Sequence, residues 1–369
     1  MEINKNCEDN LISYLTKNIE KKIYILTGKN SYYFSGAYSF FKKNLKNRRI
    51  KFYFKKEKIP QISELKKIII DLKIFNPDII LAVGGGSVID YAKLANSFKN
   101  VYNLKSNIIN SKNKFYKLAQ LVAIPTTAGS GAEITSGAVV YINKVKYSVD
   151  SKQLIPDYFF LIPRFVLKNN KHLKSSAGFD AISQSIESLI SRNSNKISVE
   201  YAISSLKLSL KHFLPYLKKS DYKNCNLMLI ASNLSGKAIS ISKTTAPHAV
   251  SYPLTSHFGI SHGDAVSITL EDFLLFNYLN LNRSDVRFNL KDRYNILFQL
   301  TKSKNIFDLI SFIKTLKDNA KTEMSFKKLN IRKEILIPKI MSGINLKRLS
   351  NNPIALNASD IKFILENKF

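Results

Sequence analysis

Three of the five histidines of this chain fall close together, in the stretch TTAPHAVSYPLTSHFGISHGDAVS at residues 244–267. They are His248, His257 and His262, and Tyr252 follows the first of them by one helical turn. Imidazole is the commonest side-chain metal ligand, and a phenol can pass a proton to a reaction product. The same residues would also suit a packed core segment, so the stretch by itself leaves metal binding, core packing and chance composition open.

A second segment with residues suited to chemistry is LAVGGGSVIDYAKLAN, residues 81–96, in which an apolar run ends at three glycines. A strand that leads into these glycines, followed by a helix capped by Ser87, would present free backbone N–H groups to a phosphate. Glycine allows close approach because no Cβ intervenes. The run is not a GxGxxG pattern, and a GGGS turn also occurs where a strand simply turns tightly into a helix.

The loop IPTTAGSGAE, residues 124–133, strengthens this interpretation. We expect it to leave a strand and enter a helix, with Thr126, Thr127 and Ser130 as hydroxyl donors. Loops at the carboxyl ends of neighbouring parallel strands face one crevice. The two loops together therefore predict a nucleotide site.

These segments require a sheet and helices to position them. Helix-length amphipathic segments such as residues 62–75 alternate with short runs that are apolar throughout, as in strands of a parallel sheet covered on both faces. The predicted strands are residues 22–29, 50–54, 78–83 and 120–127. From about residue 166 the strand pattern stops and helical patterns follow. The sequence predicts an α/β nucleotide-binding domain over residues 1–165 and an all-helical domain over residues 166–369.

Composition limits the possible partners. The 57 Lys and Arg against 27 Asp and Glu give a net charge of +30, but the basic residues are scattered singly or in pairs, as on solvated helix faces. No nucleic-acid-binding motif accompanies them, so we expect no specific nucleic acid partner. No apolar run is long enough to span a bilayer, and the first residues lack the layout of a signal peptide. With two unpaired cysteines, Cys7 and Cys225, the chain is expected in the cytoplasm, without a membrane partner.

Four motifs in order resemble the iron-containing (metal-dependent, group III) alcohol dehydrogenase family from about residue 20 to the C-terminus. They are GGGS-x-x-D, PTTAGSGAE, D-x-x-x-Q and H-x13-H, beginning at residues 84, 125, 180 and 248. The resemblance implies an N-terminal Rossmann-like parallel sheet domain and an all-helical metal-binding domain, the dehydroquinate synthase-like architecture. It also implies a cleft holding a nicotinamide cofactor and one divalent metal, Fe, Zn or Mn. The implied activity is that of an NAD(P)-dependent oxidoreductase acting on CH–OH groups.

Family metals are held by one Asp and three His, and the matching residues here are Asp180, Gln184, His248 and His262. Gln184 departs from the pattern, because its amide oxygen is a harder and weaker donor than imidazole and suits Mg or Mn better than Zn or Fe. Either the site keeps a metal, or it is degenerate. In the degenerate alternative Asp180 caps or hydrogen-bonds, and Gln184 donates to the cofactor or substrate.

The resemblance also assigns catalytic roles. His262 would serve as a catalytic ligand, since the metal would polarise an aldehyde oxygen while the cofactor delivers hydride. Tyr252 stands where many members carry another His, and it would either protonate the alkoxide or be a buried tyrosine bound to a backbone carbonyl. His257 matches no ligand position and is expected in a loop or the substrate pocket.

Cofactor preference follows from the residues after the first strand. Family members that prefer NAD carry an acidic residue there, whereas this chain has Gly28 and Lys29, so NADPH is expected ahead of NADH. Lys146 matches a lysine that contacts the cofactor, although it could be one of many surface lysines. The expected cofactor-binding residues are Gly28, Lys29, Gly85, Gly86, Ser87, Asp90, Thr126, Thr127, Ser130 and Lys146.

Within the family, the variants at residues 180–188, 248–263 and 345–361 resemble phosphonoacetaldehyde reductases, which make 2-hydroxyethylphosphonate. Arg348, Asn351 and Asn352 would then bind the phosphonate, unless RLSNNP is only a turn that docks the C-terminal helix. The expected partners are a small, anionic aldehyde or alcohol and a second copy of the chain in a homodimer. The alternatives are reduction of another small or sugar aldehyde, a dehydroquinate synthase-like lyase, and a non-catalytic basic binding protein.

Overall fold

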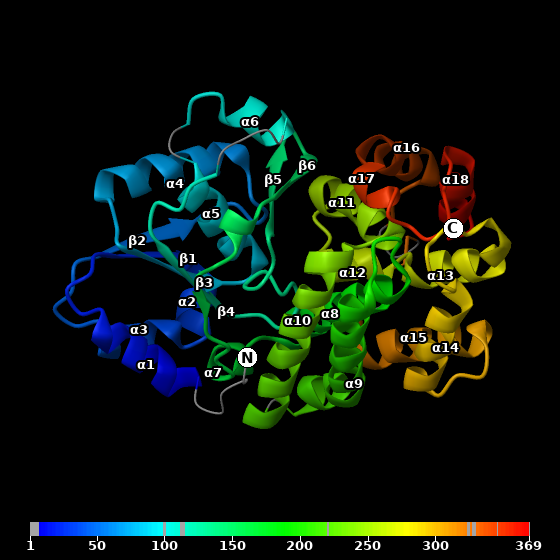
Figure 1. Cartoon of the computed structure of the whole chain (residues 1–369), viewed down its shortest axis with the longest axis horizontal. Helices are drawn as coiled ribbons and strands as arrows, with labels where there is room; N and C mark the ends of the chain where they lie inside the picture. The colour runs from blue at the N-terminus through cyan, green and yellow to red at the C-terminus, as the bar shows by residue number, and fades with distance from the viewer. Residues whose placement is uncertain are drawn as a thin grey trace. The chain divides into compact units, whose positions relative to one another are not determined.

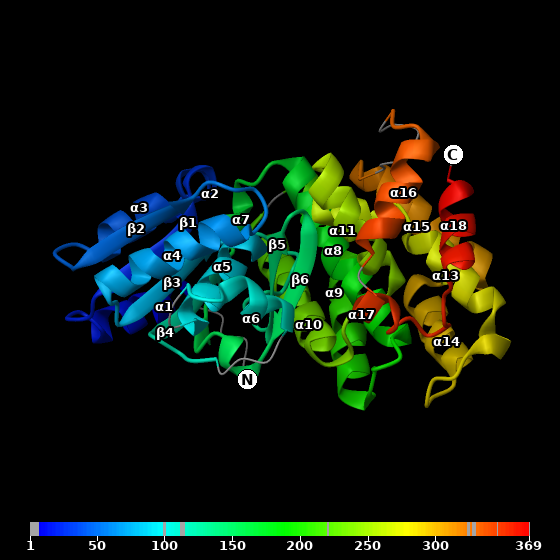
Figure 2. The same cartoon turned by 90° about the horizontal axis from the view of Figure 1, so that it is seen from above.

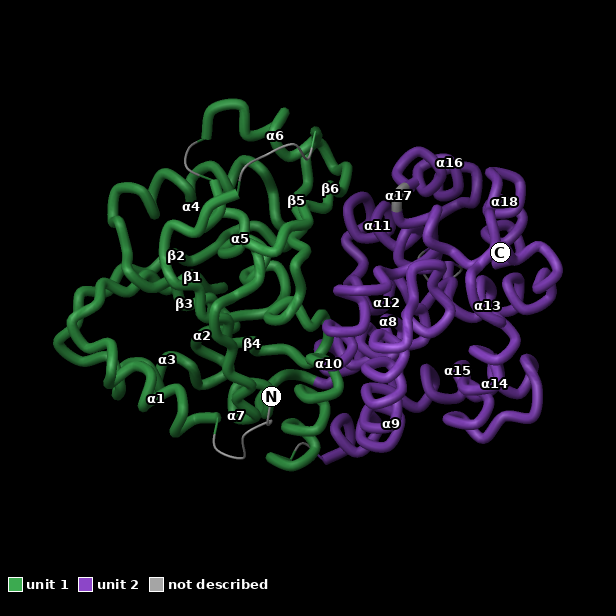
Figure 3. Tube along the Cα trace, viewed as in Figure 1, with its two compact units in different colours: residues 1–170, 220–233 green, residues 171–219, 234–369 purple. Residues whose placement is uncertain are grey.

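The chain forms two compact units, which Figure 3 shows in different colours: Met1–Asn170 with Ser220–Asn233, and Lys171–Lys219 with Leu234–Phe369. This computed structural model describes residues 7–98, 101–110, 115–219, 221–322, 325–326, 330–344 and 346–368, without the side chain of residue 347. We refer to the two as unit 1 and unit 2.

Unit 1 is built on a five-stranded sheet in which every neighbouring pair of strands is parallel. The strand order is β2-β1-β3-β4-β7. The strands are β1 (Ile23–Gly28), β2 (Ile50–Lys55), β3 (Ile79–Gly84), β4 (Gln120–Pro125) and β7 (Tyr158–Phe159). The predicted Rossmann-like parallel sheet is therefore confirmed.

Helices cover both faces of this sheet, as Figures 1 and 2 show. Alternate strand residues point to opposite faces, so that in β1 Tyr24 and Leu26 join one core while Ile23 and Ile25 join the other. The first core also contains residues of α4 (Ile62–Phe75) and α5 (Gly86–Ser97). The second contains residues of α1 (Cys7–Lys17), α2 (Lys29–Phe34), α3 (Ala37–Asn44) and α7 (Arg164–Leu167).

The order of the strands places the candidate loops together. β1 lies between β2 and β3, so the chain runs from β1 to β2 on one side of β1 and then continues through β3 and β4 on its other side. Ligands of open parallel sheets bind at the carboxyl ends of strands around such a switch point. Gly28, Gly84 and Pro125 end β1, β3 and β4 at this edge.

Two local expectations for unit 1 are wrong. The loop after β4 does not enter a helix but leads to an antiparallel hairpin of β5 (Gly137–Ile142) and β6 (Val145–Asp150). Its two turn residues, Asn143 and Lys144, have φ of 51° and 66°, as a type I′ hairpin turn requires. The helix after the glycines is preceded by Gly85 as its N-cap, so Ser87 lies within the first turn instead of capping it.

Unit 2 is helical, as predicted. It contains α8 (Lys171–Ile190), α9 (Lys196–Lys218), α11 (Ala246–Phe258) and α12 (His262–Ser267), and α10 (Tyr222–Ser242) supplies residues to both units. The remaining helices are α13 (Leu270–Leu279), α14 (Leu290–Thr301), α15 (Ile306–Ala320), α16 (Lys333–Gly343), α17 (Leu346–Leu349) and α18 (Ala358–Glu366). Among the residues that the structure describes, no helix combines the length and apolar character needed to cross a membrane.

A sharp corner between α11 and α12 depends on two glycines. Gly259 ends α11 in the left-handed conformation, with φ of 69°, and its N–H donates to the carbonyl of Thr255 at 3.1 Å. Gly263 follows in α12, where an added Cβ would lie only 1.9 Å from the carbonyl oxygen of Ser176 in α8. The missing side chain therefore lets α12 lie directly against α8.

Replacement of this second glycine tests the corner. We expect Gly263→Ala to lower the free energy of unfolding by about 3 kcal/mol, because α12 must move away from the α8 backbone. Denaturant unfolding measures the change. In the control variant Gly137→Ala the new Cβ lies 3.9 Å from its nearest neighbour, the carbonyl oxygen of Val149. Equal stability of the two variants would contradict the close approach.

Candidate metal and cofactor sites

One face of α8 carries three buried polar side chains. Asp180, Gln184 and Glu187 follow one another at spacings of four and three residues, which places them along one side of the helix. Their exposed fractions are only 4%, 3% and 0%. Buried carboxylates need compensating partners, so this face of α8 points to a cation or to a dense network of donors.

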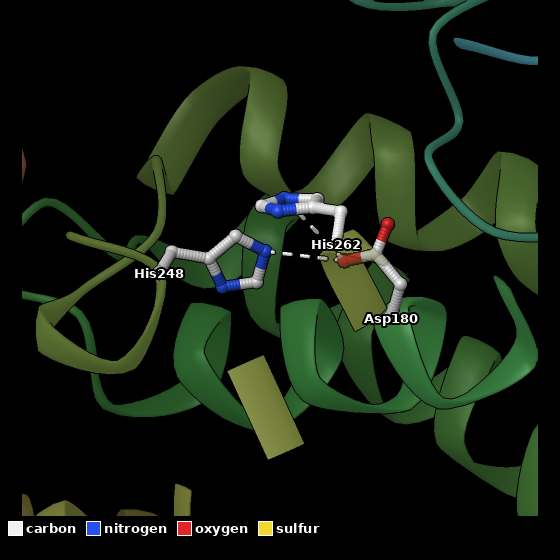
Figure 4. Close-up of side chains that lie close together, drawn as sticks. All are labelled: Asp180, His248 and His262. Atoms are coloured by element: carbon white, nitrogen blue, oxygen red, sulfur yellow. Dashed lines mark hydrogen bonds and ion pairs between the residues drawn. The ribbon is translucent and has the colours of Figure 1, made fainter. Parts of the chain in front are cut away.

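Three side chains from separate helices meet at this face. Asp180 of α8, His248 of α11 and His262 of α12 offer ligand atoms that all lie within 4.8 Å of one another (Figure 4). The Nε2 atoms of His248 and His262 lie 3.2 Å and 4.0 Å from Asp180 Oδ1. Ligands of one metal lie about 3 to 3.5 Å apart when each is about 2.1 Å from the ion. The set fits a divalent cation after small side-chain adjustments.

Glu187 supports His248 from the other side. Its carboxylate contacts Nδ1 of His248, and Oε1 also accepts hydrogen bonds from the N–H and hydroxyl of Thr245 at 3.0 and 2.9 Å. Burial lowers the pKa of His248, but the charge of Glu187 and the hydrogen bond with Asp180 outweigh it and raise this pKa to about 9. Two carboxylates around one imidazole thus favour a cation at this place.

Sequence reasoning missed Glu187, although its position was a usable signal. It lies seven residues after Asp180, on the same helix face as the candidate ligand. A carboxylate bonded to the second nitrogen of a metal-binding histidine orients the ring and raises its basicity.

Gln184 has a protein partner for its amide oxygen. The hydroxyl of Ser235 donates to Oε1 at 2.9 Å, and both side chains are buried. A carbonyl oxygen has two lone pairs, so this bond leaves room for a second interaction. Metal ligation by Gln184 remains a proposal.

Tyr252 lies next to this cluster. Its ring stacks on His262, with the centroids 5.9 Å apart, and only 4% of the residue is exposed. Burial raises the pKa of Tyr252, while the charge of Arg348 and a hydrogen bond with Thr244 act in the opposite direction. The phenol therefore stays protonated at neutral pH, and the half-buried Arg348 lies near enough to act on it electrostatically.

Three other residues predicted for the substrate, His257, Asn351 and Asn352, also belong to unit 2. His257 is in the last turn of α11, packs against Phe258, and is not part of the metal cluster found among the described residues. The amide of Asn351 donates to the carbonyls of Ser242 and Thr244, at 2.8 and 2.9 Å. Asn352 exchanges hydrogen bonds with Asn277. These contacts engage both amides within the protein, so we leave Asn351 and Asn352 out of the proposed substrate site.

In unit 1 the two candidate phosphate loops touch. A Cβ added at Gly85 would lie 3.2 Å from Thr127 Oγ1, and one added at Gly86 would lie 2.8 Å from Ser130 Oγ. The N–H of Thr126 donates to the carbonyl of Gly84 at 3.1 Å. Ser87 follows in the first turn of α5. The loops thus form one glycine-lined edge at the carboxyl ends of β3 and β4, where the missing Cβ atoms leave room for Thr127 and Ser130. The start of α5 at this edge suits a pyrophosphate, which binds to backbone N–H groups at helix N-termini.

Two other predicted cofactor residues, Asp90 and Lys146, interact electrostatically with each other. Burial raises the pKa of Asp90 to about 6, against the opposing charges of Lys93 and Lys146 and a hydrogen bond from the Val139 backbone. Lys146 in β6 is therefore close enough to act on Asp90 electrostatically.

At the end of β1, Gly28 pairs in register with Lys55 of β2. Lys29, which follows Gly28, is exposed. Both lysines thus adjoin the end of β1.

Removal of the charge of Glu187, whose carboxylate contacts Nδ1 of His248, tests the metal centre. We expect Glu187→Gln to raise the dissociation constant for Zn²⁺ or Mn²⁺ roughly 10- to 100-fold, because the ligand loses its carboxylate partner. Titration calorimetry on metal-stripped protein measures the affinity. The control is Glu200→Gln, at an exposed glutamate of α9. Equal affinities in both variants would show that Glu187 does not support a metal ligand.

Several curated proteins are similar to this chain in sequence. The phosphonoacetaldehyde reductase of Streptomyces viridochromogenes is 28% identical over 217 residues, 56% of this chain and 55% of that protein. The 4-hydroxybutyrate dehydrogenase of Clostridium kluyveri is 28% identical over 211 residues, 56% of each. The chain therefore spans about half the length of these curated relatives.

Solved structures show the same fold. A crystal structure of sulfoacetaldehyde reductase from Bifidobacterium kashiwanohense in complex with NAD⁺ has a TM-score of 0.85, with 22% sequence identity, over 99% of this chain and 95% of that one. The family model of iron-containing alcohol dehydrogenase matches residues 2–163, and the model of the C-terminal part of the Fe-containing alcohol dehydrogenase family matches residues 174–369. Because these two models together cover nearly the whole sequence, the chain belongs to the iron-containing alcohol dehydrogenase family.

Proposed function

We propose that this chain is a metal-dependent aldehyde reductase, or alcohol dehydrogenase, that uses a nicotinamide cofactor. The convergence of Asp180, His248 and His262 on one point, with Glu187 behind His248, is the observation that carries this proposal. Two imidazoles and one carboxylate are a donor set suited to Fe²⁺, and they also accept Zn²⁺ or Mn²⁺. Gln184 is the proposed fourth ligand.

The bound groups would supply the reactive chemistry, the cation as a Lewis acid and the nicotinamide as the hydride carrier. The protein's own contribution is to bind and to move a proton. The glycine edge of unit 1, with Gly85, Gly86 and the hydroxyls of Thr127 and Ser130, would hold the pyrophosphate. Tyr252, kept protonated by burial, would donate its proton to the alkoxide product.

The proposed substrate is a small aldehyde with an acidic group at its other end. Three of the compared proteins are named for such compounds, namely phosphonoacetaldehyde, sulfoacetaldehyde and 4-hydroxybutyrate, the last an alcohol with a carboxylate. Arg348, whose charge acts on Tyr252, is the candidate partner for the acidic group. Our specific proposal is reduction of phosphonoacetaldehyde to 2-hydroxyethylphosphonate.

Turnover by purified protein tests both the activity and the substrate. With metal present, we expect NADPH consumption with phosphonoacetaldehyde, and Arg348→Met should lower kcat/KM for it on the order of a hundredfold, as for a lost charge-assisted hydrogen bond. Turnover of propanal, which has no acidic group, should change little. The control is Arg164→Met, at an exposed arginine that pairs with Glu8. Equal losses for both aldehydes in the Arg348 variant would refute the anion-binding role, and no turnover of any aldehyde would refute the reductase.

The proposed cofactor preference is for NADPH. Gly28 offers no carboxylate to repel a 2′-phosphate, while Lys29 follows it and Lys55 stands opposite it in β2. A Cβ added at Gly28 would lie 4.0 Å from Lys55 Cε, so the lysine stem passes close to this position.

A charge added at Gly28 should shift this preference. We expect Gly28→Asp to change the ratio of the NADPH and NADH dissociation constants at least about tenfold toward NADH, which is ~1.4 kcal/mol. Gly28→Ala is the matched control, because it adds the same Cβ without the charge. Cofactor fluorescence measures binding independently of turnover. An unchanged ratio in the aspartate variant would place the 2′-phosphate elsewhere.

A further inference from the structure

Unit 1 contains a lysine that is completely buried. Lys93 lies about two turns into α5, after the glycine run, and none of its surface is exposed. Its ammonium donates to the carbonyl of Thr135 at 2.7 Å, to the hydroxyl of Thr135 at 2.9 Å and to the carbonyl of Gly137 at 3.0 Å. An ammonium has three N–H donors, so these acceptors use all of them.

Such burial is costly for a charged group. Burial lowers the pKa of Lys93 to about 8, although Asp90, Glu133 and Asp150 oppose this change with their negative charges. Glu133 is itself buried and accepts a hydrogen bond from Asn233 at 2.9 Å. An apolar side chain would fill the same space without this desolvation cost. The charge therefore requires an explanation beyond packing.

The position of the acceptors supplies that explanation. Thr135 and Gly137 lie just after the loop that begins at Thr126, whereas Lys93 belongs to the helix that begins at the glycine run. The hydrogen bonds of Lys93 thus connect α5, which follows the glycine run, to the residues at the end of the second phosphate loop. The two loops already touch at Gly85 with Thr127 and at Gly86 with Ser130, so a small shift of either would close or widen the edge between them.

We propose that Lys93 is a positioning residue that holds the two loops at the spacing a dinucleotide pyrophosphate requires. This inference rests on the proposed function, since it assumes that the loops bind the cofactor. Lys93 does not touch the cofactor in this account. Lys93 acts on cofactor binding indirectly, because it holds Thr135 and the loop that precedes Thr135 in place.

The test measures cofactor binding directly. We expect Lys93→Met to raise the NADPH dissociation constant roughly ten- to a hundredfold, as for a misplaced binding group. The KM for cofactor should rise in parallel, while kcat at saturating cofactor stays within about twofold. Zn²⁺ affinity in unit 2 should not change. The control is Lys66→Met, at an exposed lysine of α4.

Thr135 provides a milder pair of variants in case Lys93→Met fails to fold. Thr135→Val removes one acceptor of Lys93 and should weaken NADPH binding about threefold, whereas Thr135→Ser keeps the hydroxyl and should bind as the wild type does. A purely structural role would lower the Tm of Thr135→Val without changing its NADPH affinity, and that result would overturn the inference.

The pH dependence gives a further readout. Lys93 is charged below its pKa of about 8, so wild-type affinity for NADPH should fall as the pH rises through this value, and Lys93→Met should lose that dependence. If the wild type binds NADPH and Lys93→Met binds it equally well, only the role of Lys93 is wrong. If the wild type binds neither NADPH nor NADH, the proposed function fails as well.

Discussion

Two buried carboxylates that face one imidazole are the interaction on which the helical unit depends. Asp180 and Glu187 contact opposite nitrogens of His248, in a chain whose net charge is +30. Negative charge concentrated in a protein interior is unfavourable unless a cation or donors compensate it. The charge of Glu187 and the hydrogen bond with Asp180 raise the pKa of His248, so a protonated imidazole would compensate part of this negative charge. A divalent cation held by Asp180, His248 and His262 would compensate the negative charge of the two carboxylates more completely.

The packing of the helices around α8 follows from this requirement. Gly263 brings α12 against α8, which carries His262 toward Asp180, and Thr245 at the start of α11 holds Glu187. Hydroxyl pairs such as Ser185 with Ser205 and Ser188 with Ser242 satisfy other buried polar groups of α8. Fully bonded polar networks are rigid and fix one arrangement. The candidate ligand atoms of Asp180, His248 and His262 are thereby held close together.

Much of this arrangement follows from local patterns in the sequence. Uninterrupted apolar runs predicted four of the five strands of the parallel sheet, β1 to β4, but not the two-residue strand β7. Helical periodicity predicted residues 62–75, the bounds that α4 has. The resemblance to the alcohol dehydrogenase family, and not a local pattern, assigned His248 and His262 to one site. Local patterns fail where tertiary contacts decide. The β5–β6 hairpin was missed because its turn residues, Asn143 and Lys144, lack the glycine that usually marks such a turn.

Sequence reasoning missed two other residues because of their residue type. Glu187 and Lys93 are buried charges, yet carboxylates and lysines in a helical pattern normally face solvent, and this chain has many lysines.

Anomalous diffraction from crystals grown with Mn²⁺ tests the central claim most directly. The account predicts a metal peak about 2.2 Å from Asp180 Oδ1, His248 Nε2 and His262 Nε2. A crystal with no peak at these atoms, in which Asp180 and His248 remain paired with each other, would contradict it.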